Sequence, residues 1–303
     1  MFATAPPRPT FVAGAPAPRL AGVSHLTFGP ADGPHVFEYP PRPDVLRYLA
    51  DMVTPYGVTY SEQRFMAGNH NSYAYLGERL LAELGASPDL LLIAHATADC
   101  EPCRWPSGHL SAVCADEPLV FAISDQGELS PFSALRILRG YTTAGWRRDA
   151  VLLILDQSTV PYLDSRPPKD ERTDHAVGLA FGPGTDDGAA GPSLTVVAQR
   201  YDVTPAGVTP VLAEIAAGLP ATDGPVTVIT TDALLRHAEL PTALRGRLRV
   251  AEHGPRCIPP WATLATLITE GVTGRIALIE YDESLAGLAV AVFDGPAEPE
   301  DFR

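Results

Sequence analysis

The fold of this chain is decided by residues 125–149, DQGELSPFSALRILRGYTTAGWRRD. Apolar residues recur there at helical spacing from Phe132 to Leu138, so the stretch predicts a helix. The helix should begin near Ser130, because a serine hydroxyl can cap a helix and the proline that follows it fits the first turn. It should end before Gly145.

Apolar runs without alternation lie on both sides of this helix. LVFAIS (119–124) precedes it, AVLLILD (150–156) follows it, and LLLIAHA (90–96) lies further upstream. Such runs are typical of parallel strands that are buried on both faces. A second helix is predicted at 107–115, so the order is strand, helix, strand, helix, strand. This alternation predicts an α/β fold.

The segment before these strands predicts another helix. Residues 68–84, GNHNSYAYLGERLLAEL, place apolar side chains from Tyr73 to Leu84 at helical spacing. Asn71 is available as the N-cap of this helix, and Gly85 follows it as a stop signal.

The second part of the chain repeats the mixture of strands and helices. HAVGLAFG (175–182) and SLTVVAQRY (193–201) predict two neighbouring strands joined by a Gly-rich turn. The remaining predicted elements are helix 209–218, strand 226–231, helix 232–244, strand 248–252, helix 261–271 and strands 275–281 and 285–293. We therefore expect two similar α/β halves packed in layers.

Two segments that are poor in core residues divide the chain. Residues 1–19 are rich in Ala and Pro and predict an extended N-terminal arm. Residues 164–173, DSRPPKDERT, predict a polar linker. The first half then covers residues 20–163, and the second half covers residues 174–303.

Composition and charge limit the partners that this chain can have. Its 303 residues include 22 basic and 36 acidic side chains, which gives a net charge of −14. Nucleic acids and anionic membranes are themselves negative, so neither is expected as a partner. No run approaches the ~18 apolar residues that cross a bilayer, and the N-terminal prolines argue against an export signal. Four cysteines do not make a disulfide scaffold, so a reducing cytoplasm is the expected compartment.

Two stretches, SPDLLLIAHATADCEP (87–102) and residues 121–156, resemble the condensing enzymes of the thiolase superfamily, in particular the type III ketoacyl-acyl-carrier-protein synthases. In that family a nucleophilic cysteine begins a buried central helix. Residues 174–178 are similar to the start of the family's second half, and residues 254–267 are similar to a loop and helix near its end. The resemblance implies a thiolase-like fold in α/β/α/β/α layers, a dimer, an acyl carrier protein or coenzyme A thioester as partner, and no cofactor.

The same resemblance shows that this chain departs from the family at the catalytic positions. Counting back from Ala134 and Leu135, the cysteine of the family falls on Glu128. The histidine of the family falls on Thr231, and its asparagine falls on Pro255. The Cys-His-Asn set is therefore missing. A carboxylate cannot readily hold an acyl chain, because a mixed anhydride hydrolyses.

Two functions fit a thiolase-like chain without this catalytic set. The first is a non-condensing partner of an active ketosynthase, similar to a chain-length factor, in polyketide or fatty-acid-type secondary metabolism. The second is an enzyme with altered chemistry on an acyl-carrier-protein or coenzyme A thioester, namely an acyltransferase, thioesterase, decarboxylase or cyclase. The candidate catalytic residues of that enzyme are Glu128, Asp125, Ser124, Ser130 and His253, with His95 and His109 as further histidines.

Two further clusters, one of cysteine and histidine and one of arginine, each allow both a functional and a structural interpretation. Cys100, Cys103, His109 and Cys114 have a spacing close to that of a zinc knuckle. The last two are five residues apart on a predicted helix and point to different faces, so no metal is expected. The arginines of the second cluster are either solvated surface charge or a patch for an acidic carrier protein and its phosphopantetheine arm. They are Arg147, Arg148, Arg236, Arg245, Arg247 and Arg249.

Overall fold

The computed structural model describes most of the chain. The described residues are 17–30, 43–54, 57–146, 148–162, 173–182, 191–222, 224–251 and 257–295. Almost all of the predicted arm and linker lie outside these ranges, and so do His253 and Pro255.

Ten strands form one mixed sheet in the described part of the chain. They are β1 (Arg19–Phe28), β2 (Leu90–His95), β3 (Leu119–Ile123), β4 (Ala150–Asp156), β5 (Asp174–Gly182), β6 (Ser193–Arg200), β7 (Val226–Thr230), β8 (Arg247–Val250), β9 (Arg275–Asp282) and β10 (Gly287–Asp294). Their order is β3-β2-β4-β5-β1-β6-β10-β9-β7-β8. The first five and the last five strands therefore have the same connectivity, and the halves meet where Arg19 of β1 pairs with Ser193 of β6. This repeat confirms the prediction of two similar halves.

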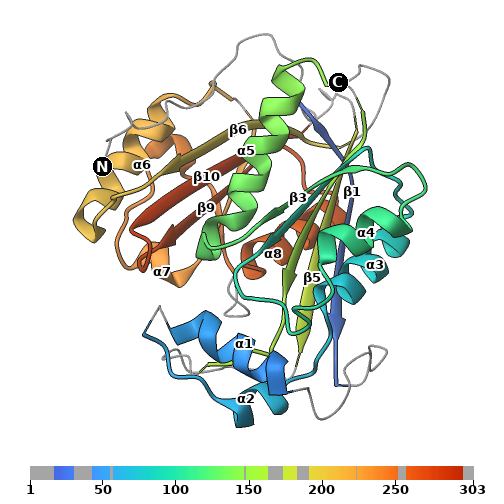
Figure 1. Ribbon diagram of the computed structural model, residues 1–303. Helices are drawn as coiled ribbons and strands as arrows, with labels where there is room; N and C mark the ends of the chain where they lie inside the picture. The colour runs from blue at the N-terminus through green and yellow to red at the C-terminus, as the bar shows by residue number, and fades with distance from the viewer. Residues whose placement is uncertain are drawn as a thin grey trace.

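Helices cover both faces of this sheet and fill the space between its halves (Figure 1). The α-helices are α1 (Pro43–Val53), α2 (Glu62–Met66), α3 (Tyr73–Leu84), α4 (Pro106–Val113), α5 (Ser130–Thr143), α6 (Val208–Ala217), α7 (Asp232–Leu235) and α8 (Pro259–Thr269). Short 3₁₀ turns are η2 (Gly127–Leu129), η3 (Pro205–Gly207) and η4 (Thr242–Leu244). Among the described helices, none combines the length and the apolar character needed to span a membrane.

The apolar core has three main parts, which correspond to the helix layers. One lies between α3, α4 and the first half of the sheet, and another between α6, α7 and the second half. The largest surrounds α5 and α8, which pack between the two halves of the sheet. There Phe132 of α5 meets Trp261 of α8 with ring centroids 5.0 Å apart, and both rings are fully buried. Each such ring contributes roughly 1.5–3 kcal/mol by leaving water.

The prediction that β5 and β6 are neighbouring strands is wrong. These strands do not pair with each other, because β1 lies between them and pairs with β5 along its whole length. The pattern of β1, RLAGVSHLTF, lacks an apolar run, since Ser24 and His25 interrupt it. Strand β5 begins at Asp174, where the second half was expected to begin, but it belongs to the first half of the sheet.

Two predicted helices also differ in detail from the structure. The helix expected at 232–244 is replaced by α7 and η4. Pro241 lies between them and excludes one continuous helix, because it lacks an N–H donor and disfavours helical geometry in the residue before it. At the start of α3 the cap is Ser72, whose hydroxyl accepts the N–H of Tyr75, and not Asn71. Gly85 ends α3 in the left-handed region at φ 58°, as predicted.

Candidate functional site

The N-terminal ends of α5 and α8 meet the carboxyl ends of several strands at one place in the molecule. Glu128 lies in η2, immediately before α5, and is half-buried. Its backbone N–H donates to Oδ2 of Asp282, the last residue of β9, at 3.2 Å. A helix N-terminus favours a negative charge, and Glu128 lies at this end of α5.

The position of Glu128 is fixed by the backbone around it. Gly127 has φ 51°, and a Cβ there would clash with Oδ2 of Asp282. The other oxygen of Asp282 accepts the N–H groups of Ser284 and Leu285, at 3.0 and 3.2 Å. The carboxylate of Asp282 thus ties the turn after β9 to the turn before α5.

A buried thiol lies in the same region. Cys257, two residues before α8, donates its backbone N–H at 2.8 Å and its thiol at 3.1 Å to Oδ2 of Asp156. Burial raises the pKa of the Cys257 thiol well above its usual range, and the charges of Asp156 and Glu128 raise it further. The thiolate is the nucleophilic form of cysteine, so this protonated thiol is a poor acyl acceptor.

A second carboxyl group, that of Glu280, is affected by the charge of Glu128. Glu280 of β9 is 2 % exposed, and its Oε1 accepts the hydroxyl of Thr231 at 2.6 Å and the N–H of Tyr281 at 3.3 Å. Burial and then the charge of Glu128 raise the pKa of Glu280 to about 8. Glu280 is therefore protonated near neutral pH. A carboxyl group that stays protonated near neutral pH can act as a proton donor.

His95, at the end of β2, contributes a neutral imidazole beside this region. Its Nδ1–H donates to the carbonyl oxygen of Thr97 at 2.7 Å, which leaves Nε2 as the acceptor. Burial lowers the pKa of His95, and the charge of Asp125 acts in the opposite direction. The ring lies against that of Tyr73, with centroids 4.9 Å apart. His95 is thus held in the form that can accept a proton.

The other predicted site residues have different surroundings. Ser130 is fully buried, and its hydroxyl donates to the carbonyl of Gly127, so it neither caps α5 as an acceptor nor faces solvent. Asp125 is exposed at φ 61° and accepts the hydroxyl of Ser124 at 3.3 Å. Thr231 lies against Glu280. His253 and Pro255 are outside the described residues.

The zinc-like motif does not form a cluster. Cys100 is buried and Cys103 is exposed, while Nε2 of His109 lies 2.9 Å from the carboxylate of Glu78. Within the described ranges, no group of three or more His, Cys, Asp or Glu side chains is arranged to hold a metal ion.

Asp156, Cys257 and Glu280 were missed as site residues from the sequence. Asp156 ends a fully buried strand, and Glu280 lies inside another strand whose residues are all buried. Carboxyl groups are rarely fully buried unless they are paired, so an acid within an apolar strand is a signal that could have identified both. Cys257 carried no comparable signal.

Comparison with known proteins supports the fold. No protein-family profile matches the chain, and no curated protein matches its sequence. Among solved structures, FabH of Pseudomonas aeruginosa PAO1, a 3-oxoacyl-(acyl carrier protein) synthase III, superposes with a TM-score of 0.58 and 16% identity, over 93% of this chain and 100% of that one. A variant of OleA from Xanthomonas campestris has a TM-score of 0.55 and 12% identity, over 92% of this chain and 98% of OleA. ChlB3, an acyltransferase, has a TM-score of 0.56 and 14% identity, over 93% of this chain and 98% of ChlB3. The chain therefore has the thiolase-like α/β fold of FabH and OleA, as the sequence resemblance predicted.

Proposed function

We propose that this chain is a non-condensing partner of an active ketosynthase in polyketide or fatty-acid-type secondary metabolism. It would contribute walls of an acyl tunnel or a docking face for an acyl carrier protein, in the cytoplasm. The observation that carries the proposal is the bonding of Cys257. This thiol is a buried, protonated hydrogen-bond donor to Asp156, and the residue at the start of the central helix is Glu128.

The chemistry of condensation supports this proposal. A condensing enzyme needs a thiolate to hold the acyl chain and donors for the enolate that develops on decarboxylation. Glu128 brings a negative charge to the place where an oxyanion would have to be stabilised. Thr231 already donates its hydroxyl to Glu280. These features of the described site support a role other than carbon–carbon bond formation.

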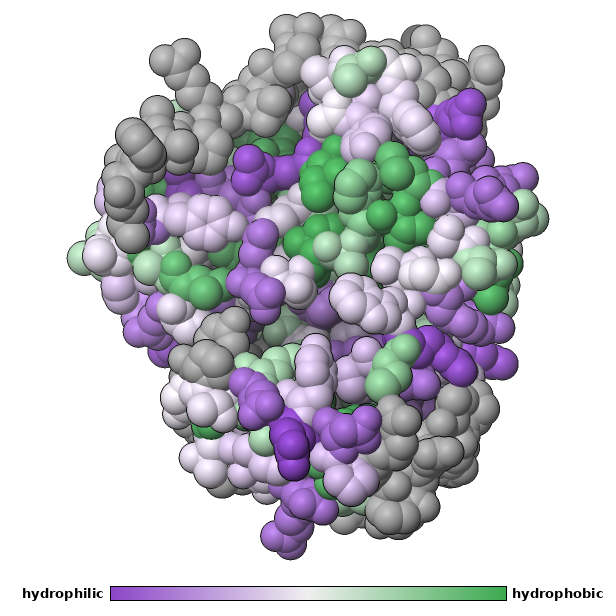
Figure 2. Space-filling view, in the orientation of Figure 1, coloured by the Kyte–Doolittle hydropathy of each residue, from purple (hydrophilic) through white to green (hydrophobic). Residues whose placement is uncertain are grey.

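The edge of the first half of the sheet offers a surface for the partner. Among the strands that the structure describes, β3 is paired only with β2, and Leu119 on it is 43% exposed. Figure 2 shows apolar side chains gathered over the face that α5 and β3 form in Figure 1. An open apolar strand edge is a template for pairing with another chain. We assign the subunit interface to this edge, for a homodimer or for a heterodimer with the ketosynthase.

Acyl labelling tests the non-condensing role. The purified chain is incubated with acyl coenzyme A and acyl-carrier-protein donors, and its intact mass is measured. We expect no covalent acyl group, while an active ketosynthase treated in parallel gains one per chain. A stoichiometric mass increase on any residue of this chain would overturn the proposal.

Substitution at the sheet edge tests the interface. Leu119→Lys should shift the chain from dimer to monomer in light scattering after size-exclusion chromatography, because it puts a charge into the pairing edge. Leu248→Lys is the matched control, since Leu248 lies on the opposite edge strand, β8, and is 42% exposed. If both variants stay dimeric, the interface lies elsewhere.

The raised pKa of Glu280, caused by burial and by the charge of Glu128, favours a second candidate function, an enzyme that acts on an acyl thioester. In a hydrolase of this kind, ionised Glu128 would take a proton from water as the water oxygen attacks the thioester carbonyl. Protonated Glu280 would then give its proton to the departing thiolate, which leaves as the thiol. Thioester turnover that disappears in Glu128→Gln but persists in Glu214→Gln, a change on the exposed face of α6, would favour this enzyme over the partner role.

A further inference from the structure

A cavity lies at the end of the second half of the sheet that faces away from Glu128. Its volume is about 910 Å³, and it is bordered by the starts of β7 and β9 and by the residues that follow α6 and α8. Helix α8 begins beside Cys257 and ends at this cavity. Its 11 residues span about 16 Å at 1.5 Å per residue, so the cavity is separate from the candidate site.

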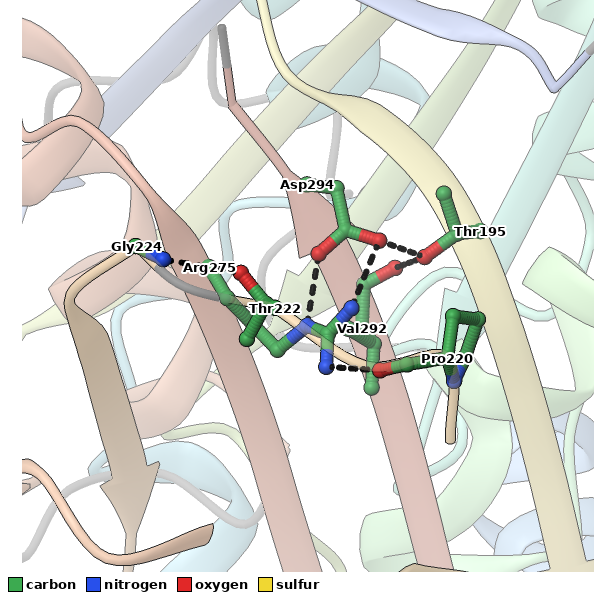
Figure 3. Close-up of polar contacts among 7 residues, drawn as sticks. All are labelled: Thr195, Pro220, Thr222, Gly224, Arg275, Val292 and Asp294. Atoms are coloured by element: carbon green, nitrogen blue, oxygen red, sulfur yellow. Dashed lines mark hydrogen bonds and ion pairs between the residues drawn. The ribbon is translucent and has the colours of Figure 1, made fainter. Parts of the chain in front are cut away.

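One residue of the cavity lining, Arg275, is held by an ion pair with Asp294 (Figure 3). Arg275 is 4% exposed, and its Nε and Nη2 donate to the two carboxylate oxygens of Asp294 at 2.6 and 3.2 Å. Its Nη1 donates to the carbonyl of Pro220 at 2.7 Å, and Asp294 also accepts the hydroxyl of Thr195 at 2.7 Å. Arg275 is therefore neutralised and held in place, and it lines the cavity without offering a free charge.

The rim of the cavity carries two further arginines. Arg245 and Arg247 are both exposed. With the described residues, Arg245 makes only a long contact of 3.5 Å from Nε to the carbonyl of Leu240. Arg247 has no ion pair or side-chain hydrogen bond with any described residue. The one acid among the described lining residues is Glu270. In a chain with a net charge of −14, this lining is a local positive site.

The remaining lining combines hydroxyl groups with apolar side chains. Thr222 and Thr242 contribute hydroxyls, and Leu219, Val226 and Val272 contribute apolar surface. Small-molecule sites have volumes of about 300–1,000 Å³ and combine an apolar wall with a few convergent polar groups. The cavity has both features.

We propose that this cavity binds a small organic phosphate. The guanidinium groups of Arg245 and Arg247 hold the phosphate oxygens, because a planar guanidinium donates two parallel hydrogen bonds to such an anion. The apolar wall formed by Leu219, Val226 and Val272 holds the organic part. This site is independent of the acyl-thioester chemistry proposed at Glu128.

Calorimetric titration at low salt tests this site, with inorganic pyrophosphate and ADP as the probes. We expect both to bind and ADP to bind more tightly, because only ADP has an organic part for the apolar wall. Arg247→Gln should weaken binding about tenfold, which corresponds to the loss of a hydrogen bond to a charged group. Glu270→Gln should tighten binding a few-fold, because it removes the acid of the lining.

Two control variants make the result specific. Arg249→Gln changes the next-but-one residue of β8, which does not line the cavity, and should leave the affinity unchanged. Glu128→Gln should also leave it unchanged, because Glu128 lies at the other end of α8. Absence of binding by both probes at millimolar concentration would overturn the proposal. So would an Arg249→Gln loss equal to that of Arg247→Gln, which would indicate diffuse charge attraction only. Equal affinity for pyrophosphate and ADP would overturn the role of the apolar wall.

Discussion

Cys257 and Asp156 are joined by two hydrogen bonds that end on the same carboxylate oxygen. The backbone N–H of Cys257 lies 2.8 Å from Oδ2 of Asp156, and the Cys257 sulfur lies 3.1 Å from it. Asp156 ends β4 in the first half of the sheet, while Cys257 leads into α8. The pair therefore anchors the start of a central helix to the sheet and at the same time keeps the thiol protonated.

The reactivity of Cys257 should depend on this anchor. Burial is the first cause of its raised pKa and Asp156 the next, so Asp156→Asn should lower that pKa and speed alkylation. Native alkylation with iodoacetamide at pH 8.5, followed by peptide mass spectrometry, measures the rate. Cys103 is exposed and should react quickly in both proteins, which makes it the internal control. Wild-type Cys257 labelled as fast as Cys103 would contradict the structure, and thermal melting of Asp156→Asn checks that the fold is retained.

The free energy of unfolding should depend on pH because the pKa of Glu280 is raised in the folded chain. Its pKa is about 8 in the folded chain and near 4.5 in the unfolded chain, so between these values only the folded state holds the proton. The contribution of Glu280 to stability is thus complete below pH 4.5 and is lost as the pH rises through 8. Glu280→Gln cannot ionise and should match the wild type at pH 5.

At pH 9 the same variant should be more stable than the wild type by a few kcal/mol, since each pKa unit corresponds to about 1.4 kcal/mol. Urea unfolding at pH 5, 7 and 9 measures the difference. Glu128→Gln should give a smaller effect in the same direction, because the charge of Glu128 is the second cause of the raised pKa. A stability difference that does not change with pH would show that Glu280 is ionised in the folded chain at neutral pH.

Gly127→Ala should disturb the turn that holds Glu128. Gly127 has φ 51°, which is unfavourable for alanine, and the new Cβ would clash with Oδ2 of Asp282. We expect a loss of about 1–3 kcal/mol in the free energy of unfolding. Gly108→Ala is the matched control, because a Cβ on Gly108 of α4 meets open space and alanine favours a helix. Equal effects of the two substitutions would exclude the clash as the cause.

These variants also show what the sequence can and cannot predict. Helix α5 and strands β2, β4 and β9 were predicted because apolar periodicity is a local property of the chain. The contact of Cys257 with Asp156 joins residues 101 positions apart, and no local pattern carries it. Strand β1 was missed because Ser24 and His25 interrupt its apolar residues. In the structure, β1 forms by pairing with β5, which is distant in the sequence. The candidate position of Glu128 followed from the register of α5. The effect of its charge on Glu280 depends on a strand of the second half of the sheet.

The pairing of β1 with β5 that the sequence missed leads to a last prediction. His25 and His175 face each other there, with Nε2 of His25 3.4 Å from Nδ1 of His175 and stacked rings 5.6 Å apart. Burial and then the charge of His25 lower the pKa of His175 to about 4. Its stabilising contribution is therefore present above pH 6.5 and lost as the pH falls through 4, because the unfolded chain takes up the proton first. His25→Gln should raise the pKa of His175, as read from its imidazole resonances in an NMR pH titration, because it removes the second cause of the shift. A His175 resonance that titrates near 6.5 in the wild-type protein would contradict this contact between the two rings.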